Sequence, residues 1–171
     1  MENRIAMFRK VSFEQYYKDY MKCFGAANRE LVKYVYDHIQ LPKRATSGSA
    51  AYDFYAPETT PLKVGKAKNI PTGISAVFPA GWVLLIAPRS GHGFKYGIGL
   101  ANHLGVIDSD FSGSDNEGHI HVKLVNDSCI AQDMEISAGE AMCQGIFVPY
   151  GLTLDDNATA KRNGGFGSTS K

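Results

Sequence analysis

Two aspartates in the segment GVIDSDF, residues 105–111, are the first candidates for acid–base chemistry. Asp108 and Asp110 are two positions apart, and on a strand this spacing points both side chains to one face. One carboxylate could then act as a general base while the other has a structural role. Taken alone, the pair fits two turn aspartates better, because aspartate is common in turns. A catalytic interpretation therefore needs support from other parts of the chain.

The segment APRSG, residues 87–91, carries groups that suit phosphate oxygens and directly follows an apolar run. The guanidinium of Arg89 is a planar fork of hydrogen-bond donors. The Ser90 hydroxyl and the free backbone of Gly91 could add further donors. An ordinary turn at the end of a strand explains the same residues, so the segment alone does not decide between the two.

The segment GGFGST, residues 164–169, could also bind a phosphorylated ligand. Backbone N–H groups of consecutive glycines can cradle phosphates, and the ring of Phe166 could stack on a base. No Gly-Lys-Ser/Thr follows, so this is not a Walker A loop. A flexible Gly/Ser tail is the plainer alternative. The aromatic ring favours an arm that folds over a ligand.

The histidines do not require a metal site. His119 and His121 would share one face of a strand, while His92 and His103 fall in loops. A zinc site needs three or four such ligands to converge, and no spacing in the chain demands that. We therefore expect no zinc site.

Length and charge limit the number of domains and the classes of partner that the chain can have. The chain has 171 residues, the size of one domain, and a net charge of +1, without the basic footprint of a nucleic-acid binder. The longest uncharged apolar run, 82–87, is far shorter than the roughly 20 residues of a membrane span. The N-terminus lacks the apolar core of a signal peptide, and the three cysteines form no C-x-x-C pair. We expect one cytoplasmic domain over residues 1–171, with no nucleic-acid or membrane partner.

Hydrophobic periodicity divides the chain into a short helical part and a long β part. Ser12 and Gln15 fit a capping box that begins a helix, and a second helix begins near Asn28 and ends before Pro42. Residues 4–11 and the short apolar runs between 45 and 150 predict strands joined by tight turns. No further helix is expected there, so this part is predicted to be all-β, and residues 155–171 are predicted to be a mobile C-terminal arm.

These segments resemble the five motifs of the trimeric deoxyuridine triphosphatase (dUTPase) family and occur in the same order. The matching segments are PKRATSGSAAYDFYA (42–56), APRSG (87–91), NHLGVIDSDFSG (102–113), GEAMCQGIFVP (139–149) and GGFGSTS (164–170). The resemblance implies a dUTPase-like jelly-roll barrel, a homotrimer with shared active sites and hydrolysis of dUTP to dUMP and pyrophosphate with Mg²⁺ on the triphosphate. Residues 12–40 then form a helical insertion near the N-terminus, a possible surface for a protein partner that we expect to be separable from catalysis.

The resemblance also assigns roles to individual residues. Asp108 matches the general base that activates the attacking water, and Phe111 matches the aromatic that lies against deoxyribose. Asp53 matches the acid that holds a magnesium-bound water. The other implied substrate contacts are Asn102, Gly105 and Ile107 at the uracil pocket, Arg89, Ser90, Gly91 and Gln144 on phosphates, Phe166 and Gly167 over the base, Ser168 and Thr169 on the γ-phosphate, and Arg162 or its neighbour Lys161 before the glycines.

Two alternatives share this fold. A dCTP deaminase would need a glutamate on the strand after the third motif, where this chain has Lys123. A non-catalytic nucleotide sensor or protein-binding module would have no need of the base Asp108. The chain also departs from the family pattern, because residues 114–118, SDNEG, lengthen the turn after the third motif. None of the departures removes the implied base.

Overall fold

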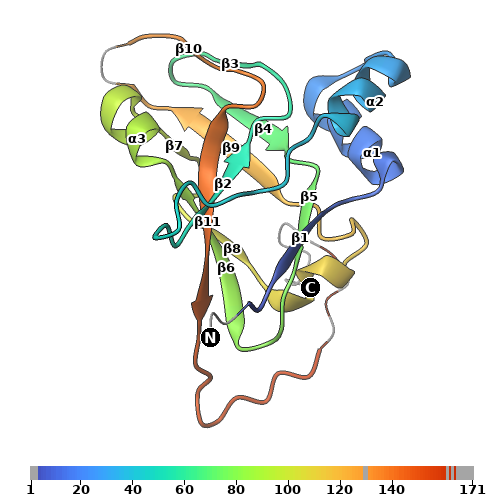
Figure 1. Ribbon diagram of the computed structural model, residues 1–171, viewed down its shortest axis with the longest axis vertical. Coiled ribbons are helices and arrows are strands. Elements are labelled where there is room, and N and C mark those ends of the chain that lie inside the picture. The colour runs from blue at the N-terminus through green and yellow to red at the C-terminus, as the bar shows by residue number, and fades with distance from the viewer. Residues whose placement is uncertain (1–3, 129–130, 161, 163, 165–171) are drawn as a thin grey trace.

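The computed structural model describes residues 4–128, 131–160, 162 and 164, and its architecture is mostly β. All strand pairs in this part of the chain are antiparallel (Figure 1). The elements are β1 (Met7–Lys10), α1 (Phe13–Phe24), α2 (Arg29–Asp37), β2 (Tyr52–Tyr55), β3 (Thr60–Leu62), β4 (Ala67–Pro71), β5 (Ile74–Val77), β6 (Trp82–Pro88), α3 (Ser90–Tyr96), β7 (Ile98–Leu100), β8 (Gly105–Ile107), the 3₁₀ helix η1 (Ser109–Gly113), β9 (His121–Asn126), β10 (Met134–Ile136) and β11 (Ala141–Pro149). The mostly β fold with two N-terminal helices confirms the prediction.

The strands of the described residues form four hydrogen-bonded sheets. The largest has the order β2-β11-β6-β8, the next has the order β4-β9-β7, and β1-β5 and β10-β3 form pairs. β11 is the central strand that carries the fourth motif between the strands of the first and second motifs. β8, on the other side of β6, carries part of the third motif, so the sheet brings four distant motifs together by backbone pairing.

α1 begins and ends where its flanking residues predict. The Oγ of Ser12 accepts a hydrogen bond from the backbone N–H of Gln15 at 3.2 Å, and the helix stops at Gly25. Half of the predicted capping box is thus confirmed. The other half is absent, because the Gln15 side chain bonds to Asp19 while the Ser12 backbone N–H bonds to Glu117. The start of the insertion is therefore tied to a turn more than 100 residues away.

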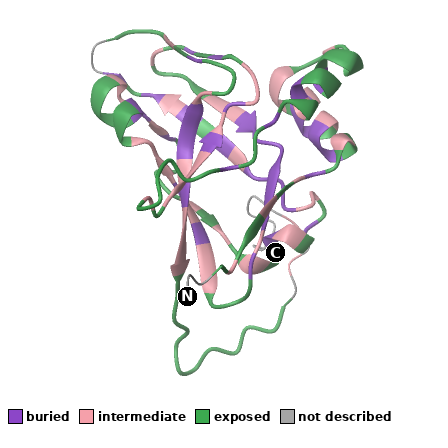
Figure 2. Ribbon diagram, viewed as in Figure 1, coloured by how far each residue is buried: buried purple, intermediate pink, exposed green. Residues whose placement is uncertain are grey.

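The insertion packs its apolar stripe onto the β core, as predicted. Figure 2 shows the inner faces of α1 and α2 buried and their outer faces exposed. Tyr16 and Val32 are fully buried. Gly73, at the turn before β5, has a φ of +73°, and a Cβ there would lie 2.3 Å from Cδ1 of Ile39. The absence of a side chain at this position lets the insertion approach the sheet closely.

One local prediction was wrong. We expected no helix after Pro42, but α3 follows β6 directly, although it contains Gly91 and Gly93, which weaken helices. Asp108 and Asp110 lie in a tight turn, the simpler of the two interpretations, because Asp108 precedes η1 and Asp110 lies within it. Among the described residues, no helix is long and apolar enough to cross a membrane.

Candidate active site

Asp108 stands at the junction of a paired strand and a tight helical turn. β8 pairs with β6, with Ile107 opposite Leu84, and this pairing fixes the residue before Asp108. The backbone carbonyl of Asp108 then accepts a hydrogen bond from the N–H of Phe111 at 3.1 Å and so begins η1. This turn places the ring of Phe111 in the core, where it is 7% exposed, while Asp108 remains at the surface.

A pocket of about 340 Å³ opens beside Asp108. Its lining includes six of the residues that the motifs predict, namely Asn102, Gly105, Ile107, Asp108, Phe111 and Arg162. The rest of its wall is formed by Leu100, in the hairpin 99–105 that the resemblance places at the uracil pocket, and by Ile86, Val106 and residues 120–123, which the sequence missed. The wall combines apolar side chains with a few polar groups at one edge, as is usual for small-ligand sites.

Arg162, in the C-terminal arm, lies against the carboxylates of the third motif. It forms an ion pair with Asp108, and its Nε donates to Oδ1 of Asp110 at 2.9 Å. Its guanidinium also lies 5.8 Å from the ring centroid of Phe111. Both carboxylates belong to the same chain as Arg162. The arm leaves β11, runs beyond the sheet and turns back to reach them (Figure 1).

The predicted phosphate and metal residues form a second group. Gln144 on β11 pairs with Asp53 on β2 and with Ala87 on β6. The Nε of Arg89 lies 3.2 Å from Oδ1 of Asp53, and the side-chain amide of Gln144 donates to the carbonyl of Pro88 at 2.9 Å. With Ser90, three of these residues line a pocket of about 370 Å³, which is open to solvent.

The two groups remain separate within one chain. The pocket beside Asp108 and the pocket beside Arg89 have no lining residue in common. Gly91 lies in α3, is exposed and lines neither pocket. Phe166, Gly167, Ser168 and Thr169, together with Lys161, lie outside the described residues.

Asp53 has the chemistry expected of a Mg²⁺ contact. Mg²⁺ usually keeps several waters and binds through one or two carboxylates together with substrate phosphates. The Asp53 side chain is 16% exposed, and its ion pair with Arg89 places next to it a guanidinium that the resemblance predicts to bind phosphate. The donor set therefore fits a water-mediated contact to a metal that is held mainly by phosphates.

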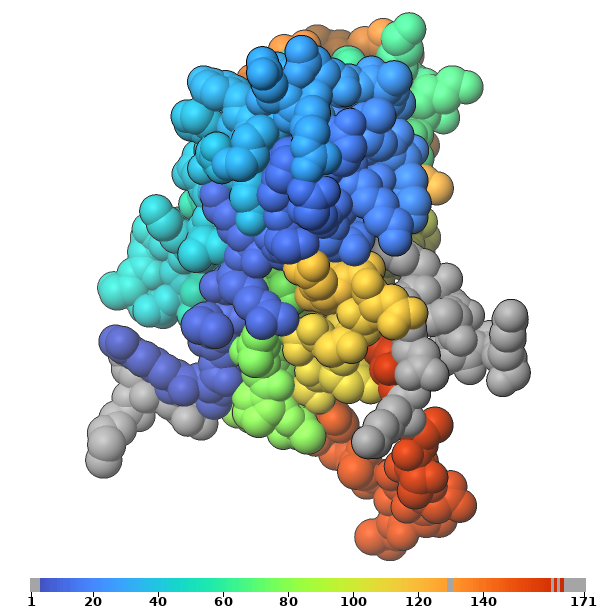
Figure 3. All heavy atoms as spheres, turned by 90° about the vertical axis from the view of Figure 1, so that its right-hand side faces the viewer, coloured from blue at the N-terminus to red at the C-terminus, as the bar shows by residue number. Residues whose placement is uncertain are grey.

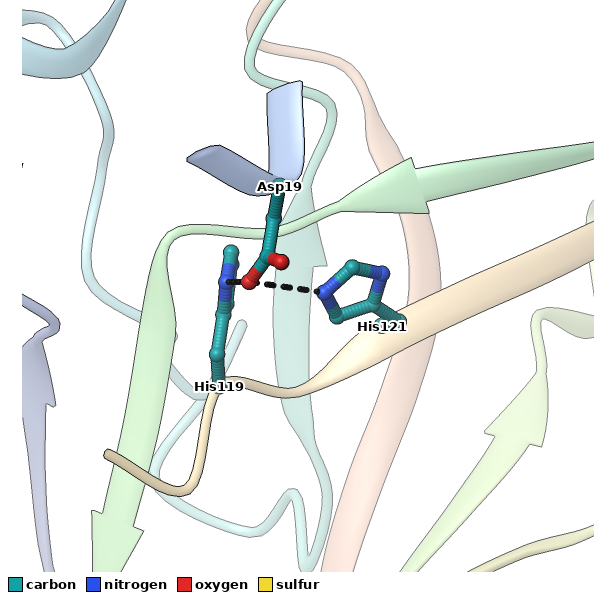
Figure 4. Close-up of side chains that lie close together, drawn as sticks. All are labelled: Asp19, His119 and His121. Carbon is teal, nitrogen blue, oxygen red and sulfur yellow. Dashed lines mark hydrogen bonds and ion pairs between the residues drawn. The ribbon is translucent and has the colours of Figure 1, made fainter. Parts of the chain in front are cut away.

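A second cluster of polar residues was not predicted from the sequence. Asp19 of α1 meets His119 and His121 in the interior (Figure 4), and their potential metal-ligating atoms all lie within 4.8 Å of one another. The sequence places the two histidines near each other but does not indicate Asp19, because nothing in the local pattern predicts contact between residues 100 positions apart.

Comparison with known proteins identifies the family. The family model for dUTPase matches residues 37–170. A deoxyuridine 5'-triphosphate nucleotidohydrolase of Lactococcus lactis is 41% identical over 142 residues, which cover 81% of this chain and 93% of the relative. The chain belongs to the dUTPase family. The match begins at the last residue of α2, so almost all of the helical insertion precedes it.

Solved dUTPase structures support the fold. The crystal structure of a dUTPase from Streptococcus mutans has a TM-score of 0.62 and 31% identity, and it covers 85% of this chain and 97% of its own. A mutant dUTPase from phage phi11 of S. aureus, described with a structural Mg(II) ion, has a TM-score of 0.62 at 17% identity and covers 92% of this chain and 98% of its own. The second likeness shows the fold alone.

Proposed function

We propose that this dUTPase-family protein hydrolyses dUTP to dUMP and pyrophosphate, with Asp108 as the general base. The observation that carries the proposal is the position of the Asp108 carboxylate, at the edge of a pocket lined by the third-motif residues Asn102, Gly105, Ile107 and Phe111. Family membership supplies the substrate class. The chemistry then needs a nucleoside held in the pocket and a phosphate chain that extends past the carboxylate.

In this mechanism Asp108 takes a proton from the attacking water. The water oxygen bonds to phosphorus as the bridging P–O bond breaks, and the departing group leaves as pyrophosphate. Phosphoryl transfer depends on positioning and on charge neutralisation more than on covalent chemistry. Mg²⁺, when bound to the triphosphate, supplies part of that neutralisation. Asp53 would hold a water of that ion, and Arg89, Ser90, Gly91 and Gln144 would bind the phosphate oxygens.

Phe111 and the wall of the pocket select the sugar and the base of the substrate. The ring of Phe111 is fixed in the core and faces the sugar, which leaves no room for a 2′-hydroxyl. Asn102 and the backbone around Gly105 pair with the edge of the base. A pocket that hydrogen-bonds one base leaves its own groups unpaired against another, and this can discriminate by large factors.

Arg162 changes partner during the cycle in this proposal. In the described structure it neutralises two carboxylates, Asp108 and Asp110. A triphosphate entering the pocket offers more negative charge and pairs of phosphate oxygens that match the guanidinium fork. Transfer of Arg162 to phosphate then frees Asp108 to accept a proton and draws the arm, with Phe166, Gly167, Ser168 and Thr169, over the nucleotide.

We further propose a homotrimer in which different subunits supply the two groups of site residues. The support is the separation of the Asp108 pocket from the Arg89 pocket within one chain. β8 is an edge strand of its sheet, and Val106 on it is 59% exposed beside the Asp108 pocket. A neighbouring subunit that covers this edge and brings its Arg89 group would complete the site.

Pyrophosphate release from dUTP, dCTP, dTTP and UTP, measured together with ammonia release, tests the proposed function. We expect pyrophosphate from dUTP and little from the others. Ammonia from dCTP would instead indicate the deaminase, although Lys123 lines the pocket at the position where that enzyme needs a glutamate. Nucleotide binding without either product would indicate a sensor. The cytoplasmic location and a partner at the insertion stay predictions.

A further inference from the structure

The two parts of the chain that depart from the family pattern contact each other. α1 of the insertion lies on the turn 114–120, which joins η1 to β9 and contains the added residues 114–118. Figure 3 shows the N-terminal helices directly above this turn on one face of the molecule. Two polar contacts, one in the middle of the turn and one where it leads into β9, join them.

The first contact joins the start of α1 to Glu117. The backbone N–H of Ser12 donates to Oε2 of Glu117 at 2.7 Å, and its hydroxyl donates to Oε1 at 2.6 Å. Glu117 has a φ of +59°, a left-handed conformation that L residues adopt only when their surroundings hold them there. Burial works against the ionised carboxylate, but the two donors outweigh it and lower the pKa of Glu117. The insertion therefore holds the turn in a strained conformation.

The second contact joins the buried face of α1 to His119 and His121, which lie on either side of Ile120 where the turn leads into β9. Oδ2 of Asp19 lies 2.7 Å from Nδ1 of His119 and 3.3 Å from Nε2 of His121, as Figure 4 shows. The side-chain amide of Gln15 donates to the same oxygen at 2.6 Å. Asp19 is 5% exposed and His119 is fully buried. This carboxylate thus holds the residues on either side of Ile120.

The neighbouring donors fix which nitrogen of each ring carries its proton. The backbone N–H of Gly73 donates to Nε2 of His119 at 2.8 Å, so the ring proton is on Nδ1 and points at Asp19. The side-chain amide nitrogen of Asn69, which can only donate, lies 3.2 Å from Nδ1 of His121. The proton of His121 is therefore on Nε2, which also faces Asp19. Both rings donate to one carboxylate.

This pattern argues for a hydrogen-bonded anchor and against a metal site. A metal bound at Nδ1 of His119 would move the ring proton to Nε2, where it would face the N–H of Gly73 at hydrogen-bond distance. Ligand histidines normally donate their second N–H to an acceptor. Asp19, by contrast, already accepts three hydrogen bonds. Burial alone would raise its pKa, but the bonds from His119, His121 and Gln15 hold that pKa far below the usual range.

The anchored turn forms part of the nucleotide pocket. Ile120 and His121 line the pocket beside Asp108, as does Phe111 in η1, which precedes the turn. The carbonyl of Phe111 accepts from the backbone N–H of Ser114 at 3.1 Å. Gly118 packs so closely on η1 that a Cβ there would lie 2.5 Å from Cα of Ser112. A shift of the turn would therefore move Phe111 and the wall opposite it.

We propose that Asp19 is a positioning residue for substrate selection: through His119 and His121 it holds the turn that places Phe111 against the sugar. This inference rests on the proposed function, in which Phe111 excludes a 2′-hydroxyl. It also revises the expectation that residues 12–40 are separable from catalysis. The insertion supports the pocket wall from behind, without touching the nucleotide.

The test is the ratio of kcat/KM for UTP to that for dUTP in Asp19→Asn. Coupling through packed groups typically changes a distant equilibrium by roughly 2- to 30-fold, and we expect the ratio to rise within that range. Glu14→Gln is the matched control, because it makes the same carboxylate-to-amide change on the same helix. Glu14 is exposed and pairs with Arg29 inside the insertion, so its ratio should equal that of wild type. Asp19→Glu should restore part of the discrimination.

A folded Asp19→Asn variant with the wild-type ratio would overturn the proposal. So would tight, stoichiometric Zn²⁺ binding to the wild-type protein that Asp19→Asn abolishes, because the cluster would then be a metal site. If Asp19→Asn does not fold, Glu117→Gln at the exposed contact decides by the same ratio. If wild type releases no pyrophosphate, the proposed function fails, and calorimetric Kd values for dUTP and UTP then report the positioning role separately.

Discussion

Gly73→Ala measures how closely the insertion is packed on the β core. The glycine has a φ of +73°, and a non-glycine residue in this region costs about 1–2 kcal/mol. The added Cβ would also lie 2.3 Å from Cδ1 of Ile39, and overpacking a core typically costs about 1–3 kcal/mol. Together these terms lower the free energy of unfolding by about 2–5 kcal/mol. In a chain of this size we expect Tm to fall by roughly 4–20 °C.

Gly65→Ala separates the two terms. Gly65 has a φ of +67°, and no atom lies within 4 Å of a Cβ built there, so only the backbone cost applies. Ile39→Val removes the Cδ1 atom that overlaps and by itself costs about 0.5–1.5 kcal/mol. In the Gly73→Ala background it should cost less or even stabilise. Thermal melts at one fixed protein concentration measure all four variants. A Gly73→Ala protein that melts no lower than Gly65→Ala would refute the close packing.

Three further predictions concern the site and its supports. Phe111→Ala should raise kcat/KM for UTP relative to dUTP, and an unchanged ratio in steady-state assays would discard its role at the sugar. Burial lowers the pKa of His119 despite the hydrogen bond from its ring to Asp19. Below about pH 6.5 the His119 side chain therefore binds a proton in the unfolded chain but not in the folded chain. The free energy of unfolding should therefore fall from pH 7.5 to 5.5, by at most about 1.4 kcal/mol per pH unit, and His119→Asn should remove this contribution; an equal slope in denaturant melts of the two proteins would contradict it. The other titratable groups around the ring are Tyr16, His121 and Glu117. Finally, inactive Asp108→Ala and Arg89→Ala chains, unfolded and reassembled together in equal amounts, should regain about a quarter of the wild-type activity if the two groups come from different subunits of a ring. Mixed trimers without activity would show that one chain supplies both.

Local signals predicted the elements whose ends are set by nearby residues. Ser12 and Asn28 accept hydrogen bonds from the first turns of α1 and α2, and their positions locate both helices. Antiparallel strands were also predictable, because short apolar runs alternate with turn residues. α3 was not predictable, because its two glycines disfavour a helix. The segment directly after β6 is nevertheless helical.

Sequence patterns could not predict the contacts between segments that are distant along the chain. Asp19 and His119 are 100 residues apart, and the bond from Ser12 to Glu117 spans 105 residues. The motifs predicted which residues belong to the site. They could not show that a single chain divides these residues between two pockets, because that division follows from the sheet order and not from the spacing along the chain.

The most direct test of the central claim is turnover and binding of dUTP by Asp108→Asn. We predict that kcat falls by about 10²- to 10⁴-fold, the usual contribution of a general base, while the Kd for dUTP stays close to that of wild type. Asp110→Asn is the matched control, because it removes the other carboxylate paired with Arg162 and should lose far less activity. If Asp108→Asn hydrolyses dUTP within a few-fold of wild type, Asp108 is not the base and the proposed mechanism is wrong.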